Sequence, residues 1–191
     1  MTPKTPRRKI EVRDSGVHGR GVYAVAPIAA GAKIIEYTGE RISWAEAVDR
    51  HPHDPSQPNH TFYFHLDGGL VIDALYGGNN ARWINHACEP NCEADEVDGR
   101  VFIKALRDLE PGEELFYDYG LVLDERHTAK VKKQFACWCG AATCRGRAAI
   151  RAACTPDAAD APATGGGITA CLCAARAGPV GQIQRHAWPA A

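Results

Sequence analysis

The sequence predicts a mainly β protein with one domain of short strands. Three observations lead to this class. Between residues 10 and 119 the apolar residues recur in short, alternating or β-rich runs, glycine or proline closes most of these runs, and only one stretch has a helical pattern. A chain of 191 residues with 45% hydrophobic content can bury one good core, whereas two full-size domains would both be thinly packed.

The expected elements follow one another along this region. The strand runs are "GRGVYAVAPI" at 19–28, "AKIIEYTGE" at 32–40, "TFYFHLDGGLVIDA" at 61–74, "VFIKALRDL" at 101–109 and "EELFYDYG" at 113–120. The third run predicts two strands about a Gly-Gly turn. The helical stretch is "SWAEAVDRH", with Ser43 as the N-cap and Glu46 in the capping-box position.

Both ends of the chain differ in composition from this core. Residues 1–9 carry the basic run "PKTPRRK", which we interpret as a solvated N-terminal tail, with contact to an acidic partner as the alternative. Residues 151–191 are rich in alanine, glycine and proline and have too few large apolar residues to offset the entropy of ordering. We therefore expect a disordered tail, in which the pair Cys171 and Cys173 is incidental and not a metal site.

The charge balance excludes partners that need a strong overall field. Twenty-two Lys and Arg against 23 Asp and Glu give a net charge of −1, so we expect no direct nucleic-acid binding and no membrane association. No apolar run is long enough to span a bilayer, and the N-terminus lacks a signal-peptide core. The composition suggests a high-GC genome, so we expect a cytoplasmic protein if the source is bacterial, with export into a host or a nuclear location left open.

Eight cysteines require an explanation. A disulfide framework is one possibility, but such scaffolds are usually shorter and secreted. Metal binding explains the cluster "CWCGAATC" better, although its three cysteines, Cys137, Cys139 and Cys144, are one short of a tetrahedral zinc site. A fourth ligand must come from elsewhere in the chain.

Five motifs in a fixed order resemble SET-domain protein lysine methyltransferases with a post-SET zinc-binding segment. They are "HGRGVYA", "EYTGE", "RWINHACEPNC", "GEELFYDYG" and "CWCGAATCRG", and the resemblance covers about residues 10–147. It implies a SET domain at 10–121, a linker at 122–136 and a post-SET segment at 137–150. The implied fold is a β-fold of several small sheets with a C-terminal pseudoknot, where "INHACEPN" and "ELFYDYG" meet.

The resemblance implies an S-adenosylmethionine-dependent protein-lysine N-methyltransferase. Tyr119 corresponds to the catalytic tyrosine, and Tyr37 and Tyr117 belong to the same channel around the target lysine. A lysine amine with a pKa of about 10.4 must lose its proton before it attacks, and a desolvated aromatic channel favours that neutral form. Because the residue two positions before Tyr119 is a tyrosine, we expect mainly monomethylation with some dimethylation.

The same resemblance implies where the methyl donor binds. Eight residues are implied in cofactor binding: His18, Gly19, Arg20, Phe62, Arg82, Asn85, His86 and Trp138. The first three form a turn whose backbone approaches the methionine part, and Asn85 and His86 act largely through backbone groups near the adenine. We expect His86 to contribute position more than chemistry, and Trp138 to pack against the adenine.

The resemblance also supplies the fourth metal ligand. It implies one structural zinc held by Cys88, Cys137, Cys139 and Cys144. Cys92 is a near neighbour that could substitute, although we interpret it as a buried free thiol.

The substrate is implied as a protein segment that binds as an added strand along the edge of "TFYFHL". A histone, a nucleoid protein and a ribosomal protein all fit, and the oligomeric state is not predicted. The alternative functions are a catalytically silent SET-like binding module and a zinc-stabilised nucleic-acid-binding protein, and the neutral net charge disfavours the latter.

Overall fold

The computed structural model describes residues 8–51, 56, 60–121, 128, 129, 133 and 136–145. Four of the regions expected from the sequence lie largely or wholly outside the described residues: the basic tail up to residue 7, most of the linker 122–136, residues 146–150, and the tail 151–191 with Cys171 and Cys173. Within the described part, no helix is long and apolar enough to cross a bilayer.

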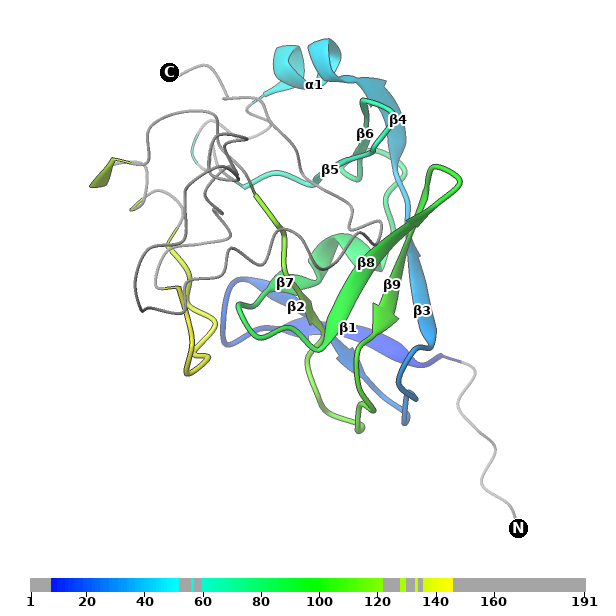
Figure 1. Ribbon diagram of the computed structural model, residues 1–191, viewed down its shortest axis with the longest axis vertical. Helices are drawn as coiled ribbons and strands as arrows, with labels where there is room; N and C mark the ends of the chain where they lie inside the picture. The colour runs from blue at the N-terminus through cyan, green and yellow to red at the C-terminus, as the bar shows by residue number, and fades with distance from the viewer. Residues whose placement is uncertain are drawn as a thin grey trace, which may run out of the picture.

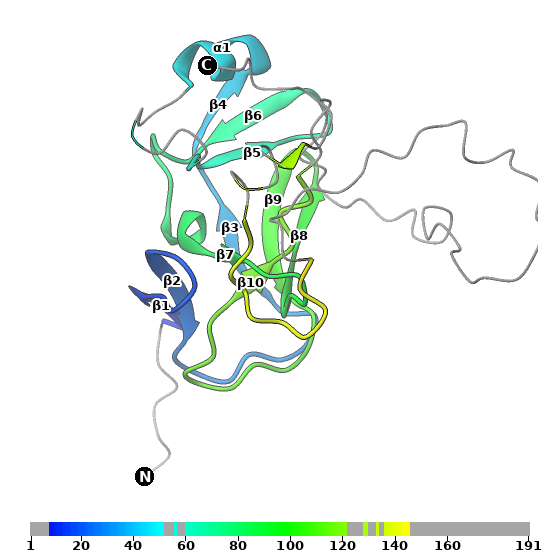
Figure 2. The same cartoon turned by 90° about the vertical axis from the view of Figure 1, so that its left-hand side faces the viewer.

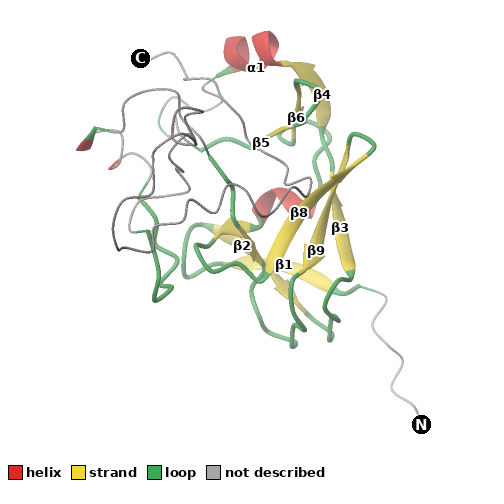
Figure 3. Ribbon diagram, viewed as in Figure 1, coloured by secondary structure: helices red, strands yellow, loops and turns green. Residues whose placement is uncertain are grey.

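Short strands dominate the described part of the chain, as Figure 3 shows, and this confirms the mainly β prediction. They form four small sheets, whose strands β1–β9 are labelled in Figure 1 and whose strand β10 is labelled in Figure 2. Two antiparallel sheets of three strands have the orders β3-β9-β8 and β4-β6-β5, β1 pairs with β2, and β7 pairs with β10. The strands are β1 (Ile10–Asp14), β2 (Arg20–Ala24), β3 (Lys33–Tyr37), β4 (Glu40–Ser43), β5 (Tyr63–His65), β6 (Leu70–Asp73), β7 (Asn85–His86), β8 (Cys92–Val97), β9 (Arg100–Ala105) and β10 (Phe116–Tyr117).

The predicted helix is present as α1 (Trp44–Arg50). Its N-cap is Ser43, whose hydroxyl accepts a hydrogen bond of 3.1 Å from the backbone N–H of Glu46. This satisfies one of the free donors of the first turn. A short 3-10 helix, η1 (Asn80–Trp83), leads into β7 and is capped in the same manner by Asn79.

Four strands lie outside the strand runs expected from the sequence: β1, β7, β8 and all of β4 except its first residue. β8 is the longest of them. β8 has the polar sequence CEADEV and pairs with β9 across the two residues Asp98 and Gly99. Both residues have positive φ, 51° and 70°, which fits a tight hairpin turn. The Asp-Gly pair was the available signal, but the acidic strand before it lacks the β-branched pattern used to find strands.

The parallel pair of β7 and β10 brings two distant motifs together. Asn85 lies opposite Phe116, and His86 lies opposite Tyr117. The expected meeting of "INHACEPN" and "ELFYDYG" is therefore confirmed, although the second strand is much shorter than predicted. Figure 2 shows this pair between the β1–β2 sheet and the β8–β9 hairpin.

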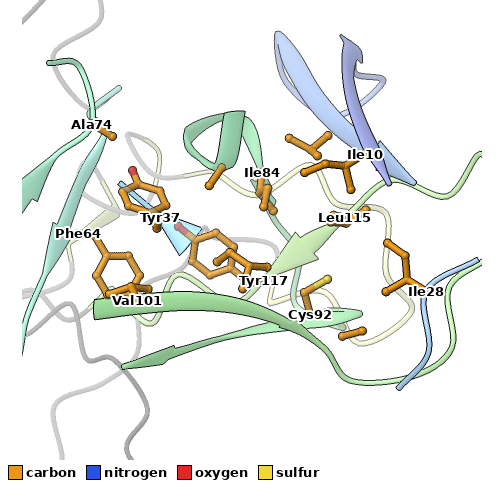
Figure 4. Packing of buried hydrophobic residues seen from close by; sticks show 14 of the residues in the cluster. Ile10, Ile28, Tyr37, Phe64, Ala74, Ile84, Cys92, Val101, Leu115 and Tyr117 are labelled. Carbon is orange, nitrogen blue, oxygen red and sulfur yellow. The ribbon is translucent and has the colours of Figure 1, made fainter. Parts of the chain in front are cut away.

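A single main hydrophobic cluster lies beneath these sheets, and Figure 4 shows part of it. Side chains such as Val22, Ile103 and Leu115 are fully buried in it. Tyr37 and Tyr117 belong to the same cluster. The core thus extends up to the tyrosines implied in catalysis, and they occupy fixed positions in packed surroundings.

Candidate active site and cysteine cluster

Three tyrosines from two distant segments of the chain form the centre of the candidate site. Tyr37 ends β3, Tyr117 ends β10, and Tyr119 follows two residues later. The ring centroids of Tyr117 and Tyr119 are 4.9 Å apart. Tyr37 and Tyr117 are only 4% and 6% exposed, and Figure 4 shows them in the same part of the core.

The hydroxyl groups of these tyrosines have different partners. Tyr37 donates a hydrogen bond of 2.9 Å to the carbonyl of Phe62, and Tyr119 donates one of 2.9 Å to the carbonyl of Ile84. No described residue forms a hydrogen bond with the Tyr117 hydroxyl. Two phenols are therefore fixed by the backbone, and the third remains available to a water molecule or a bound amine.

Burial raises the pKa of all three phenols, and the carboxylate of Glu114 raises the pKa of Tyr119 further. The phenols are thus neutral at physiological pH. Because the Tyr119 O–H is donated to the carbonyl of Ile84, the phenol oxygen can position a reacting group as a hydrogen-bond acceptor, and the raised pKa makes it poorly suited to act as a base.

The turn of His18, Gly19 and Arg20 lies against the start of β7. Gly19 has a φ of +49°, which a glycine adopts without strain. The side-chain amide nitrogen of Asn85 lies 3.3 Å from the carbonyl oxygen of His18 and 2.9 Å from that of Arg20. Asn85 is expected to act largely through backbone groups, and its side chain in addition fixes this turn.

Glu114 supports Asn85 from the other side. Its carboxylate accepts hydrogen bonds of 3.0 Å from the Asn85 amide and 2.8 Å from the Tyr23 hydroxyl. A Cβ atom on Gly21 would lie 2.1 Å from the same carboxylate, so this glycine leaves the space that Glu114 occupies. Glu114 was not among the predicted site residues because its partners come from distant segments.

Aromatic and arginine side chains gather next to this turn. The rings of Phe62 and Trp83 meet edge to face with centroids 5.0 Å apart. The guanidinium carbons of Arg20 and Arg82 lie 5.2 and 4.9 Å from the Trp83 ring centroid. The structure therefore brings Arg20, Phe62 and Arg82 together, as expected for neighbours of one site, and Trp83 is an additional member that lies inside the "RWINH" motif.

The ring of His18 belongs to the same group. Its centroid is 5.3 Å from that of His60, which is 5.0 Å from that of Phe62. Trp138 differs, because 72% of it is exposed. Its expected packing against a bound adenine stays a prediction.

Four cysteines converge although their positions in the chain differ widely. The sulfur atoms of Cys88, Cys137, Cys139 and Cys144 all lie within 4.8 Å of one another. Cys88 Sγ lies 3.8 Å from Cys137 Sγ and 4.0 Å from Cys144 Sγ. Tetrahedral zinc with Zn–S bonds of about 2.3 Å places its sulfur ligands about 3.8 Å apart, so the arrangement fits that ion.

The chemistry of the four ligands fits zinc as well. The backbone N–H of Cys88 lies 3.5 Å from Cys139 Sγ. Burial opposes ionisation of Cys139, but hydrogen bonds from the N–H groups of Cys88 and Ala141, together with those from the thiols of Cys137 and Cys144, outweigh it and lower the pKa of this thiol to about 7. Cys92 is fully buried in the hydrophobic core, outside the cluster, which agrees with its interpretation as a free thiol.

Residues 19–120 match the family model described as "SET domain". The chain belongs to the SET-domain family. Among similar proteins, a histone-lysine N-methyltransferase specific for H3 lysine-4 from Candida albicans is 42% identical over 148 residues, covering 74% of this chain and 14% of that protein. The histone-lysine N-methyltransferase trithorax of Drosophila virilis is 38% identical over 146 residues, covering 74% of this chain and 4% of that protein.

A solved structure carries the same fold. The SET domain described here aligns with a chain of "ctPRC2 in an autoinhibited conformation bound to S-adenosylmethionine" with a TM-score of 0.53 and 34% identity. The alignment covers 59% of this chain and 15% of that chain. The SET-domain chain thus spans a small part of the length of the relatives it matches.

Proposed function

We propose that this protein is an S-adenosylmethionine-dependent protein-lysine N-methyltransferase. The observation that carries the proposal is a group of neutral phenols beside the turn that Asn85 fixes: Tyr37 and Tyr117, which are buried, and Tyr119, which is partly buried. Membership of the SET-domain family and the names of the relatives support this reaction. The similar solved structure is bound to S-adenosylmethionine, and this supports the choice of methyl donor.

The donor, when bound, supplies a methyl group already activated by its sulfonium charge. The protein therefore has to remove water, orient a neutral amine and exclude competing reactions. Tyr37 and Tyr117 form a low-dielectric wall that disfavours the ammonium form of the lysine. The Tyr119 phenol, fixed by the carbonyl of Ile84, aligns the groups that react and stabilises developing charge.

We assign the binding of the donor to two groups of residues. The backbone of His18, Gly19 and Arg20 would hold its methionine part, with Asn85 keeping that turn in place. The remaining predicted residues, Phe62, Arg82, His86 and Trp138, would contact or flank its ribose and adenine.

The four cysteines would hold one structural zinc ion. Such an ion would fix residues 136–145 beside β7 and β10, where Figure 2 shows the yellow segment. Its role would be structural because all four ligand positions belong to cysteines and none is left for a reacting group.

The proposed substrate is a basic protein segment bound beside β5. This strand lies at the edge of the β4-β6-β5 sheet in the described part of the chain, and an added strand would extend that sheet. The relatives are named for histone lysines, so a histone or a histone-like basic protein is the substrate class we propose. We further propose that monomethylation predominates.

A transfer assay tests the proposal. Purified protein is incubated with labelled S-adenosylmethionine and either mixed histones or a cell lysate, and the labelled residue is mapped by mass spectrometry. We expect methyl-lysine in at least one basic protein and almost none with Tyr119→Phe. Confirmed binding of the donor without transfer to any protein would contradict the proposal and favour a silent binding module.

A further inference from the structure

Asp118, the residue between two of the site tyrosines, lies at a junction that the family motifs do not explain. Its side chain is 16% exposed. One carboxylate oxygen accepts a hydrogen bond of 3.0 Å from Arg145 and another of 3.1 Å from the backbone N–H of Gly120. Asp118 thus fixes the turn that carries Tyr119 and joins it to the residue that directly follows the ligand Cys144.

His86 forms a second connection between the same two regions. Its Nδ1 atom accepts a hydrogen bond of 3.2 Å from the backbone N–H of Tyr119. A neutral imidazole with an accepting Nδ1 carries its proton on Nε2. That Nε2 atom lies 3.6 Å from the sulfur of Cys88, so the ring donates to a cysteine ligand on one side and accepts from Tyr119 on the other.

Arg145 links the two connections. Its backbone N–H lies 3.4 Å from Cys88 Sγ, and its guanidinium donates to Asp118. The guanidinium also lies 3.5 Å from Nε2 of His86, which is a packing contact and not a hydrogen bond, because both atoms carry protons in this tautomer. The side chain of His86 is 9% exposed and that of Arg145 is 33% exposed. An exposed ion pair contributes little, but a pair with one largely buried carboxylate and several shared partners is screened far less.

We propose that Arg145 is a positioning residue for Tyr119. It fixes Asp118, and with His86 it makes the placement of the Tyr119 backbone depend on the cysteine cluster. The cysteine cluster thereby influences the position of Tyr119 as well as the binding of the methyl donor. This inference rests on the proposed methyltransferase function, because it assigns Tyr119 a place in that reaction.

The test uses four variants of the full chain: Arg145→Ala, Arg145→Lys, Asp118→Asn and the double variant of Arg145→Ala with Asp118→Asn. The matched control is Arg107→Ala, which removes an ion pair with Glu113 in which Arg107 is 55% exposed. Four quantities are measured for each: kcat, the Kd for S-adenosylmethionine, the zinc content, and hydrogen exchange of the backbone in residues 115–121.

We expect Arg145→Ala to lower kcat about tenfold, since small displacements of a positioning group are costly. The zinc content and the Kd should stay within about twofold of wild type, and residues 115–121 should exchange faster. Arg145→Lys should have a higher kcat than Arg145→Ala, because lysine keeps the positive charge, but a lower kcat than wild type, because it lacks the planar guanidinium. The double variant should be no slower than the slower single variant, as expected for two residues that act as one unit.

Two results would overturn the inference. One is a kcat for Arg145→Ala equal to that of Arg107→Ala, together with unchanged exchange in residues 115–121. The other is loss of zinc in step with the loss of rate, since Arg145 would then act on the cluster alone. If the wild-type protein transfers no methyl group, the proposed function fails, and the exchange rates still decide whether Arg145 fixes the Tyr119 segment.

Discussion

The strand framework of residues 10–121 and the cysteine segment of residues 136–145 are stabilised in different ways. The framework contains fully buried side chains from most of its strands, whereas none of the described residues in the cysteine segment is buried. That segment is connected to the framework by sulfur atoms, by hydrogen bonds between Thr143 and Glu89, and by the Arg145–Asp118 pair. Hydrophobic burial therefore stabilises one region, whereas the other would depend on the proposed zinc ion.

Removing a proposed metal ligand should give the largest effect, because it should impair the cysteine segment and leave the framework folded. We expect Cys88→Ser to lower the zinc content well below one per chain and to weaken binding of S-adenosylmethionine by about tenfold or more, because the cysteine segment loses its attachment. The framework should stay folded, since its core includes none of the four ligands. Metal analysis, calorimetry of donor binding and circular dichroism measure these outcomes.

Cys92→Ala is the matched control for that experiment. Cys92 is fully buried in the framework, so its loss should lower stability and leave the zinc content unchanged. Full zinc occupancy in Cys88→Ser, or loss of zinc in Cys92→Ala, would show that the assignment of ligands is wrong.

Tyr119→Phe should lower the rate of methyl transfer and leave the fold of both regions intact. The phenol donates to the carbonyl of Ile84, and its proposed role lies mainly in the transition state, so we expect kcat to fall about a hundredfold with little change in donor affinity. Steady-state kinetics combined with calorimetry separate the two quantities. A rate near that of wild type would remove the catalytic role of this hydroxyl.

Tyr117→Phe should change the product more than the rate. No described residue forms a hydrogen bond with the Tyr117 hydroxyl, which leaves it available to hold an ordered water beside the amine. That water occupies the space a methylated nitrogen needs to turn, so wild type should give mainly monomethyl-lysine and the variant should give more di- and trimethyl-lysine. Mass spectrometry of one peptide over time measures this, and an unchanged distribution would contradict the interpretation.

Alkaline pH should weaken the framework through its buried phenols. The folded state raises the pKa of Tyr37, Tyr117 and Tyr119 above the ordinary 10.0, so the stabilisation is fully present below about pH 10 and is lost as pH rises. The free energy of unfolding should fall above pH 10 by at most about 1.4 kcal/mol per pH unit for each phenol. Urea unfolding of Tyr117→Phe should show a shallower fall than that of Tyr76→Phe, which replaces an exposed tyrosine; equal slopes would count against the burial argument.

The two regions also show which features the sequence predicts and which it does not. The strands with β-branched runs, the capped helix and the four converging cysteines were predicted, because each leaves a local pattern or a motif. The strands β1, β7 and most of β4 also lay outside the expected runs, and β8 was missed because it is acidic. Glu114 and the Arg145–Asp118 pair were missed because they join segments far apart in the chain, and no local pattern records which polar side chains will meet.

The parallel pairing of β7 with β10 has a consequence for the order of folding. The β8–β9 hairpin closes through Asp98 and Gly99 alone, so its two strands meet quickly and at small entropic cost. The β7–β10 pair must enclose that whole hairpin before Asn85 can lie opposite Phe116, and such distant contacts form slowly. During synthesis we therefore expect the hairpin to form first, and the tyrosines to meet the cysteine ligands only after residue 145 has left the ribosome.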